Sequence, residues 1–399
     1  MTTIPGSQLF DVTAPGQDVV VQVTSTGTDL PGAAEGKFNL EVFNGYGPPP
    51  PLAPGYQGLA VLGSIELISG SYAVTDLSGN NNTMIANGTN ETITGGTGNE
   101  TMISNGNANV INGGGQDTIT VNGHADTVNG AGNDSINVFG SSAVINGGTG
   151  NDTINLYGDV GNTGTGDTVA AGSGNTVVNV YSSHNVIQGS SANDTISVYT
   201  NNNTVTGGGN DSITVFGNNE VVLGGPGGND TIAVYGNNNT IGGSGGSDSI
   251  NVFGSANILN VGNGNDTINE YGVGDTINAG SGNEVITIFN SGVVLDQGSG
   301  NETVNVYGSN DTINAGSGNS TLFLNSSGTE FNDNANIYHD IVVGFDEGSD
   351  HIHLTTDTPG AVIATQHPVN GGLDTQITLF DGSTILFKGI THVDGGFFN

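Results

Sequence analysis

Acidic residues recur along the middle of this chain at a nearly constant interval, and their type and spacing could hold metal ions. Most stand in an Asn-Asp-Thr-Ile step or a close variant, and successive copies are 17 to 19 residues apart, with one gap of 42 residues. That gap contains a degenerate copy, Gly174-Asn175-Thr176-Val177. The interval predicts a repeat of about 18 residues. The recurring acidic residues are Glu100, Asp117, Asp134, Asp152, Asp194, Asp211, Asp230, Asp248, Asp266, Glu284 and Glu302.

Glycine-rich turns precede many of these acids. Stacked repeats would place successive carboxylates about 5 Å apart, where each neighbouring pair would repel by roughly 3 kcal/mol. Calcium relieves that repulsion because it binds about six to eight oxygens from carboxylates and carbonyls, and glycine lets a turn fold its carbonyls inward. The repeat has no nitrogen or sulfur ligand that would favour zinc or copper. We therefore expect multiple Ca²⁺ ions on the acidic residues and on the turn glycines Gly148, Gly150, Gly262, Gly264, Gly280 and Gly282. The alternative is a solvated acidic edge without ions.

A second, weaker copy of the motif lies half a repeat later. Its acid position holds Asp126, Ala143, Asp167, Asn185, Asn203, Glu220, Asn239, Asn257, Asp275, Val293 and Asp311 in succession. Five of these eleven residues are carboxylates and four are Asn, so the acidic set is interrupted, and the glycines of the first half are largely missing. Two nonapeptides therefore make one unit, and we expect only the edge with the continuous acidic set to bind ions.

The residues after each acid alternate between polar and apolar, which predicts short strands. In Thr303-Val304-Asn305-Val306 and Thr312-Ile313-Asn314 the apolar side chains fall on one face. Such short strands are not stable alone, but stacked turns bury a continuous apolar column. The predicted fold class is all-β: a right-handed parallel β-roll or β-helix solenoid with about 18 residues per turn, and small β-rich parts at both ends.

The repeat resembles the calcium-binding repeats-in-toxin (RTX) family, whose nonapeptide is Gly-Gly-x-Gly-x-Asp-x-apolar-x. Residues 147–155 match it fully, whereas the second-half copies keep only its Asp-x-apolar end. Residues 340–354 resemble the strand pair that caps serralysin-type β-rolls. Residues 382–387 and the Phe397-Phe398-Asn399 end resemble the uncleaved signal of type I secretion. The resemblance implies calcium-dependent folding outside the cell and export without an N-terminal signal.

Composition divides the chain into four parts. Residues 1–47 form a strand-rich N-terminal region with strands expected at 8–13, 18–25 and 38–43. Residues 48–78 combine a stiff proline-rich spacer at 48–54 with entry strands over 59–68. Residues 79–325 form the RTX-like roll, and residues 326–399 form a C-terminal cap and secretion signal.

The charge balance excludes several classes of function. The chain has 37 acidic and 2 basic residues, a net charge of −35, so we expect no binding to nucleic acid or to anionic membranes. No apolar stretch is long enough for membrane insertion. Cysteine is absent, which removes disulfides and thiolate sites. Repetition gives each acid the same environment, whereas a general acid needs an environment different from that of its partner carboxylate, so we expect no enzyme.

Aromatic residues stand five positions after the acid position of the first-half copy in ten successive turns. One interpretation is ring-on-ring stabilisation of the roll. The other is an exposed stripe for a partner, because alternation from buried Ile154 and Leu156 would point Tyr157 outward. The irregular repeat length argues against a match to an ice lattice. The aromatic positions are Phe139, Tyr157, Tyr181, Tyr199, Phe216, Tyr235, Phe253, Tyr271, Phe289 and Tyr307.

These features together favour a secreted, extracellular or cell-surface protein that binds calcium and has a structural or adhesive role. We expect it to fold on Ca²⁺ and to self-assemble into a layer or fibre, with copies of itself or a surface polysaccharide as partners. The alternatives are a polysaccharide- or ice-binding module, or the non-catalytic part of a secreted hydrolase or epimerase.

Overall fold

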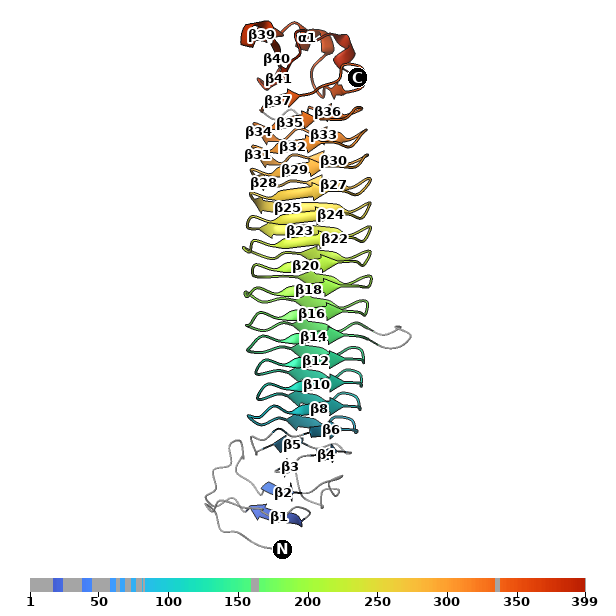
Figure 1. Ribbon diagram of the computed structural model, residues 1–399, viewed down its shortest axis with the longest axis vertical. Helices are drawn as coiled ribbons and strands as arrows, with labels where there is room; N and C mark the ends of the chain where they lie inside the picture. Colours follow the sequence, from blue (N-terminus) through green and yellow to red (C-terminus); the bar gives the residue numbers. More distant parts are fainter. Residues whose placement is uncertain are drawn as a thin grey trace. The chain divides into compact units, whose positions relative to one another are not determined.

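The fold is an all-β parallel solenoid of about 14 turns with about 18 residues per turn and almost no helix. The structure is a computed structural model that describes residues 81, 83–158, 165–333 and 338–398, together with the backbone of five earlier strands. It divides into two compact units, unit one (Met1–Thr195) and unit two (Ile196–Asn399). Figure 1 shows the strands stacked turn upon turn within each unit.

Each turn of unit one gives a four-residue strand to one sheet and a three-residue strand to the other. Neighbouring turns pair in parallel and in register, so that Ile136 lies between Ile119 and Ile154. The four-residue strands are β6 (Thr83–Ala86), β8 (Thr101–Ser104), β10 (Thr118–Val121), β12 (Ser135–Val138), β14 (Thr153–Leu156) and β16 (Val177–Val180). The three-residue strands are β7 (Thr92–Thr94), β9 (Val110–Asn112), β11 (Thr127–Asn129), β13 (Val144–Asn146), β15 (Thr168–Ala170) and β17 (Val186–Gln188).

Unit two repeats the same arrangement. Its four-residue strands are β20 (Ser212–Val215), β22 (Thr231–Val234), β24 (Ser249–Val252), β26 (Thr267–Glu270), β29 (Val285–Ile288), β32 (Thr303–Val306) and β35 (Thr321–Leu324), after β18 (Thr195–Val198) at the boundary. The other sheet contains β19 (Thr204–Thr206), β21 (Val221–Leu223), β23 (Thr240–Gly245), β25 (Ile258–Gly264), β27 (Thr276–Asn278), β30 (Val294–Asp296), β33 (Thr312–Asn314) and β36 (Glu330–Asn332). Two-residue strands in the turns extend it: β28 (Ser281–Gly282), β31 (Ser299–Gly300) and β34 (Ser317–Gly318).

The predicted alternation is confirmed by the burial of side chains along each strand. In β32 the side chains of Val304 and Val306 are fully buried, and in β33 only Ile313 is buried. Aliphatic residues from successive turns therefore stack on one another as the core, which is why no single strand needs to be stable alone.

Five strands precede β6, and only their backbone is described. They are β1 (Gln17–Val23), β2 (Phe38–Asn44), β3 (Gly58–Val61), β4 (Ile65–Ile68) and β5 (Ala73–Asp76). β1 pairs antiparallel with β2, whereas β3, β4 and β5 join the parallel stacking. The strands expected at 18–25 and 38–43 are found close to their predicted bounds, and the run 59–68 is two strands. The strand expected at 8–13 and the spacer at 48–54 lie outside the described residues.

The C-terminal part continues the stacking for one further turn and then folds over it. β37 (His339–Val343) pairs with β35, and β38 (His351–His353) pairs with β36. β41 (Thr384–Lys388) pairs with β37 and with β40 (Asp374–Thr378), which pairs with β39 (His367–Val369). Short helices α1 (Pro359–Ile363), η1 (Asn370–Gly372) and η2 (Gly395–Phe397) complete it.

Aromatic side chains of the C-terminal part pack against the last apolar residues of the solenoid. Phe345 and Phe387 line one small apolar cavity with Leu322, Leu324 and Phe331. The ring of Phe345 meets that of Phe387 edge to face at 5.3 Å. The apolar end of the solenoid is thus covered in unit two.

Candidate metal centres

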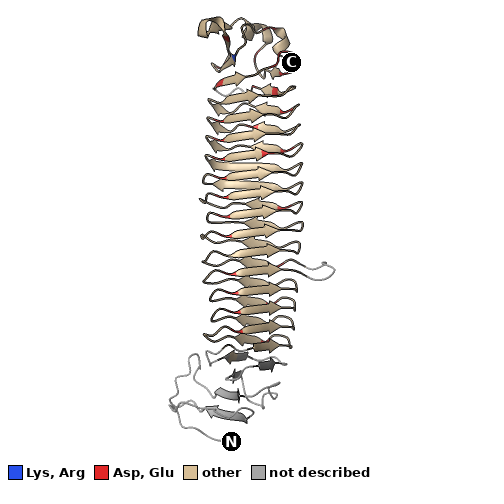
Figure 2. Ribbon diagram, viewed as in Figure 1, with Lys and Arg blue, Asp and Glu red and all other residues tan. Residues whose placement is uncertain are grey.

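The eleven recurring acidic residues form what we call the acidic column, and it lies inside the fold. Each of these side chains is only 1–3% exposed. Local alternation sets the direction of the side chain, since the acid stands two residues before a buried aliphatic residue, as Asp152 does before Ile154. The turns stacked on either side then bury it. Figure 2 shows the acidic residues recurring from turn to turn along the solenoid. The interpretation of a solvated acidic edge is therefore wrong.

One oxygen of most column aspartates accepts a hydrogen bond in a ladder between turns. The backbone N–H of Asp134 donates to Oδ1 of Asp152 (2.8 Å) in unit one. In unit two the N–H of Asp230 donates to Oδ1 of Asp248 (2.7 Å), and the N–H of Asp248 donates to Oδ1 of Asp266 (2.6 Å). The carboxylates therefore satisfy backbone donors that would otherwise be buried without a partner.

The second oxygen of several column residues is buried without any hydrogen-bond donor. Leaving such an acceptor bare costs about 1–3 kcal/mol, and more when it is charged. The earlier turns differ, because the N–H groups of Gly114 and Ala131 donate to Oδ2 of Asp117 and Asp134 at 3.0 Å. The bare oxygens are Oδ2 of Asp152, Asp230, Asp248 and Asp266, both oxygens of Glu284, and Oε1 of Glu302.

Glycine backbone surrounds these bare oxygens. A Cβ atom added to Gly224 would lie 2.2 Å from Oδ2 of Asp230, and one added to Gly243 would lie 2.4 Å from Oδ2 of Asp248. At Gly282 an added Cβ would meet Oε1 of Glu284 at 2.5 Å and a backbone carbonyl oxygen as well. Any larger residue would fill the space beside the carboxylate, so glycine keeps it open.

Burial raises the pKa values of several column carboxyls, and a neighbouring carboxylate adds to the rise at some of them. Burial, with the neighbouring charges of Asp230 and Asp266, raises the pKa of Asp248 to about 6. Burial and the proximity of Glu302 raise the pKa of Glu284 to about 8. Without a positive charge the column therefore favours protonated carboxyls, whereas a bound cation would stabilise the ionised form.

The donor set fits a hard cation. In the part of the chain that the structure describes, no three His, Cys, Asp or Glu side chains converge as a metal cluster. A cation beside the column would therefore take carboxylate oxygens from adjacent turns and complete its shell with backbone carbonyls. All available donors are oxygens, which suits Ca²⁺ and not zinc or copper.

Comparison with known families agrees with this chemistry. The model of the RTX calcium-binding nonapeptide repeat matches four stretches of the chain, residues 85–117, 179–213, 235–268 and 296–326. These stretches are RTX calcium-binding repeats. They bind multiple calcium ions, and each coincides with stacked turns of the solenoid. No curated protein matches the chain.

The six glycines singled out in the sequence have a structural role in the turns of the solenoid, and two of them, Gly262 and Gly264, lie within a matched RTX stretch. Gly148, Gly150, Gly262, Gly264 and Gly280 all have positive φ angles between 89° and 148°. At each of these five glycines and at Gly282, an added Cβ would lie 1.4 to 2.6 Å from a backbone carbonyl oxygen of an adjacent turn. They allow the turns to stack closely. The glycines beside bare carboxylate oxygens include Gly147, Gly224 and Gly243. These three were not among the glycines predicted from the sequence.

The second-half positions, from Asp126 to Asp311, form a second column that we call the mixed column, because it combines carboxylates with asparagines and two apolar residues. It has the same ladder of hydrogen bonds between turns. The N–H of Asp167 donates to the amide Oδ1 of Asn185 (2.7 Å), and the N–H of Glu220 donates to that of Asn239 (2.7 Å). An amide oxygen thus replaces a carboxylate oxygen without changing the geometry. The two edges of the RTX solenoid differ in charge and in glycine content but not in the ladder itself.

The acidic column and the mixed column both continue into the C-terminal part. They do so through residues that were predicted from the sequence to belong to the cap. The N–H of Ser320 donates to Oδ1 of Asp340 (2.8 Å), and the N–H of Thr329 donates to Oδ1 of Asp350 (2.8 Å). Burial, with the charge of Glu302, raises the pKa of Asp340 to about 7. Each of these aspartates stands two residues before a buried apolar residue, a signal that was present in the sequence.

One turn of unit two carries a glutamate in the core. Glu270 ends β26 at the position that Val252 and Ile288 occupy in the adjacent turns, and it is fully buried. Its Oε1 accepts from the N–H of Gly272 (2.6 Å), while Oε2 has no donor. Burial and the neighbouring Asp275 raise its pKa to about 9. This carboxyl is therefore protonated at neutral pH.

Proposed function

We propose that this chain is a secreted structural or adhesive protein of the cell surface that folds on Ca²⁺ and associates with copies of itself. Its RTX repeats make it a calcium-binding protein. RTX repeats are typically structural or binding modules, and proteins that carry them are generally extracellular. In the described part of the chain, no helix is long and apolar enough to cross a membrane.

The observation that carries the calcium-driven folding is the set of bare carboxylate oxygens inside the acidic column. We assign the column residues as the calcium ligands, with carbonyl oxygens of the glycine turns completing each site. Without cations the column would bury several uncompensated charges, which strongly destabilises a folded state. Ion binding to the folded state alone would then stabilise it by mass action.

Circular dichroism with and without calcium tests this function. We expect little β-structure in excess chelator at pH 7.5 and restoration of the β spectrum by calcium. Magnesium is the matched control, because it demands a tighter octahedral shell and releases its waters reluctantly. Magnesium should restore much less β-structure than calcium at the same concentration. An unchanged β spectrum in chelator would contradict calcium-driven folding.

Two further observations support a role outside the cell and association between copies. The net charge of −35 opposes contact between copies until bound cations reduce it. Stacked aromatic side chains are exposed along each unit, and exposed apolar stripes of this kind commonly mark interaction surfaces. We assign export to the type I route, with the C-terminal part as its signal.

A further inference from the structure

Gln297, in unit two, is a buried amide whose polar atoms have no partner. It is only 1% exposed, and neither Oε1 nor Nε2 makes a hydrogen bond. Burying a polar group in this way costs about 1–3 kcal/mol. The backbone of Gln297 is well paired, because its N–H donates to the carbonyl oxygen of Asn314 (3.1 Å). The side-chain amide is thus the part that lacks a partner.

The register of the sheet shows where this side chain points. Residues that pair in register on successive turns are Gly242, Asn260, Asn278, Asp296 and Asn314. Gln297 directly follows this row, as Gly243 does, and an added Cβ at Gly243 would clash with the bare Oδ2 of Asp248. Glu302 stands as far after Gln297 as Asp248 stands after Gly243. The side chain of Gln297 therefore enters the space beside the acidic column.

The adjacent turns show that packing does not require an amide at this position. Ala279 stands one turn before Gln297 and Ala315 one turn after it, and both are at most 1% exposed. A small apolar side chain is therefore sufficient here. The longer, unpartnered amide of Gln297 points instead to a ligand in the space beside the column.

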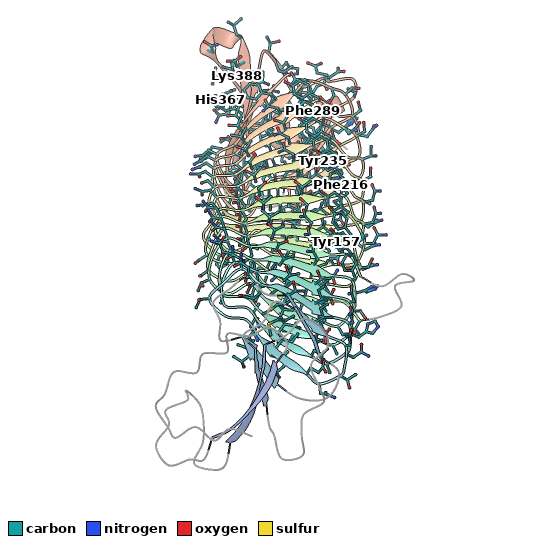
Figure 3. All side chains as sticks on the ribbon, turned by 60° about the horizontal axis from the view of Figure 1, so that its bottom comes forward. Tyr157, Phe216, Tyr235, Phe289, His367 and Lys388 are labelled. Atoms are coloured by element: carbon teal, nitrogen blue, oxygen red, sulfur yellow. The ribbon has the colours of Figure 1, made fainter. Side chains whose placement is uncertain are left out.

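Two glutamates of the acidic column lie in this part of unit two. Glu302 belongs to the same turn as Gln297, and Glu284 belongs to the adjacent turn, which also carries the labelled Phe289 in Figure 3. Both carboxyls are at most 3% exposed. They interact directly, since the proximity of Glu302 adds to burial in raising the pKa of Glu284 to about 8.

The two carboxyls and the amide together offer four bare oxygens. Two belong to Glu284, one is Oε1 of Glu302, and one is Oε1 of Gln297. The other oxygen of Glu302 accepts from the hydroxyl of Ser320 (2.6 Å), which fixes the orientation of that carboxyl. Asp248, by comparison, offers one bare oxygen.

Backbone carbonyls lie beside these oxygens. A Cβ added to Gly300 would clash with the carbonyl oxygen of Gly282 and would lie 2.9 Å from Oε1 of Glu302. Ca²⁺ binds about six to eight oxygens, from carboxylates, side-chain amides and backbone carbonyls alike. The two carboxylates also balance the charge of one divalent cation, whereas a monovalent ion would leave a buried charge uncompensated.

We propose that Gln297, Glu284 and Glu302 are ligands of one calcium site, in which a side-chain amide occupies the space that glycine leaves open in other turns. This inference rests on the proposed binding of calcium by the acidic column and adds a ligand from outside that column. Ser320 is a positioning residue, because it holds the carboxyl of Glu302. Affinity for calcium rises with the charge and rigidity of the ligands, so this site should bind more tightly than the sites beside Asp230 and Asp248.

Substitution by methionine tests the ligand. Gln297→Met keeps an unbranched side chain but replaces the hard oxygen by a thioether, which does not suit Ca²⁺. Native mass spectrometry should count one bound ion fewer than in the parent chain at the free calcium concentration that just saturates the parent. About tenfold more calcium should restore that ion. Gln297→Glu, which keeps a side-chain oxygen, should bind as many ions as the parent.

The matched control is Gln188→Ala, which removes an exposed amide at the end of β17 and should leave the ion count unchanged. Circular dichroism at saturating calcium should show the parent β spectrum for every variant. If Gln297→Met loses that spectrum, Gln297→Ala gives the same comparison, because Ala279 and Ala315 already occupy this position in adjacent turns.

The opposite role would give the opposite count. If Nε2 of Gln297 donated to Glu302 and so replaced an ion, Gln297→Ala would bind one ion more than the parent. That result, or an unchanged count in Gln297→Met, would overturn the inference while leaving calcium-driven folding intact. A parent chain that binds no calcium would instead reject the proposed function itself.

A double-mutant cycle tests whether the ligands share one ion. Glu302→Gln should also lose one ion at the same calcium concentration. If Gln297 binds that same ion, adding Gln297→Met should cause no further loss, so the two effects should be non-additive. Additive loss of two ions would assign Gln297 to a different ion and overturn the proposed set of ligands.

Discussion

At the scale of single residues, the aspartates with a bare oxygen have two separable roles. In Asp230 and Asp248, Oδ1 accepts the ladder hydrogen bond, and Oδ2 is the bare oxygen assigned to calcium. Changing Asp230 and Asp248 to Asn keeps an amide oxygen for the ladder, as in the mixed column, but removes both charges. We expect the calcium midpoint of folding to rise about tenfold or more, equivalent to about 1.4 kcal/mol. The control is Asp126→Asn, at a mixed-column carboxylate whose two oxygens accept from the N–H of Asn109 and the hydroxyl of Ser104; it should change the midpoint by less than about twofold. Equal effects of the two variants in calcium titrations would mean that the bare oxygens are not the calcium ligands.

The buried Glu270 gives a second prediction at this scale. Its raised pKa means that the stability contributed by this carboxyl is fully present below about pH 4.5, the ordinary pKa of the group, and is lost progressively as the pH rises to about 9. Glu270→Val restores the aliphatic side chain that the adjacent turns carry. We expect this variant to have a higher melting temperature in calcium and to lose less of it between pH 7.5 and 10 than the parent chain. Glu347→Gln, which removes an exposed charge, is the control and should follow the parent. An identical pH profile for Glu270→Val would show that Glu270 is not the titrating group.

At the scale of elements, buried carboxyls of the acidic column should make the ion-free fold sensitive to pH. Burial raises the folded-state pKa of several of them above that of the unfolded chain, to about 6 at Asp152 in unit one and about 8 at Glu284 in unit two. Raised acid pKa values favour the folded state below about pH 4 and destabilise it as the pH rises through about 6 to 8. The calcium-free chain should therefore gain β-structure when the pH is lowered from 8 to 5, as followed by circular dichroism. With saturating calcium the same pH change should have little effect. A calcium-free spectrum that does not respond to pH would contradict the column as the source of instability.

At the scale of the whole molecule, the C-terminal part has a packing role that can be separated from its proposed export role. Phe387 is fully buried and packs against Phe345 and Phe397 over the end of the solenoid. Phe387→Ala should destabilise the calcium-loaded protein by about 3–5 kcal/mol and promote aggregation, since an uncovered end offers unpaired strand edges. Export of the Phe387→Ala variant should continue.

Removal of residues 326–399 should abolish both folding of the C-terminal end of the solenoid and secretion through a type I exporter. Efficient secretion of the truncated chain would reject the signal assignment.

The sequence by itself determined the features that depend on local alternation and on repetition. The period of the acidic residues predicted the solenoid, and the pattern in Thr303-Val304-Asn305-Val306 predicted β32 and its buried face. The same alternation correctly pointed Tyr157 away from the core. These features are accessible from sequence because side chains alternate within one strand whatever lies on either side of it.

Only the tertiary structure decided what each turn does to its neighbours. Whether an acid at a turn is solvated or buried depends on the turn stacked against it, and the structure buries the whole acidic column. The equivalence of Asn239 and a carboxylate became visible only through the N–H of Glu220, a residue 19 positions away. Asp340 joins the acidic column although its sequence spacing departs from the repeat, because register between turns is fixed by hydrogen bonds and not by chain length. The stacking of the Tyr235 ring between the rings of Phe216 and Phe253 likewise follows from contacts between successive turns, which no single repeat contains.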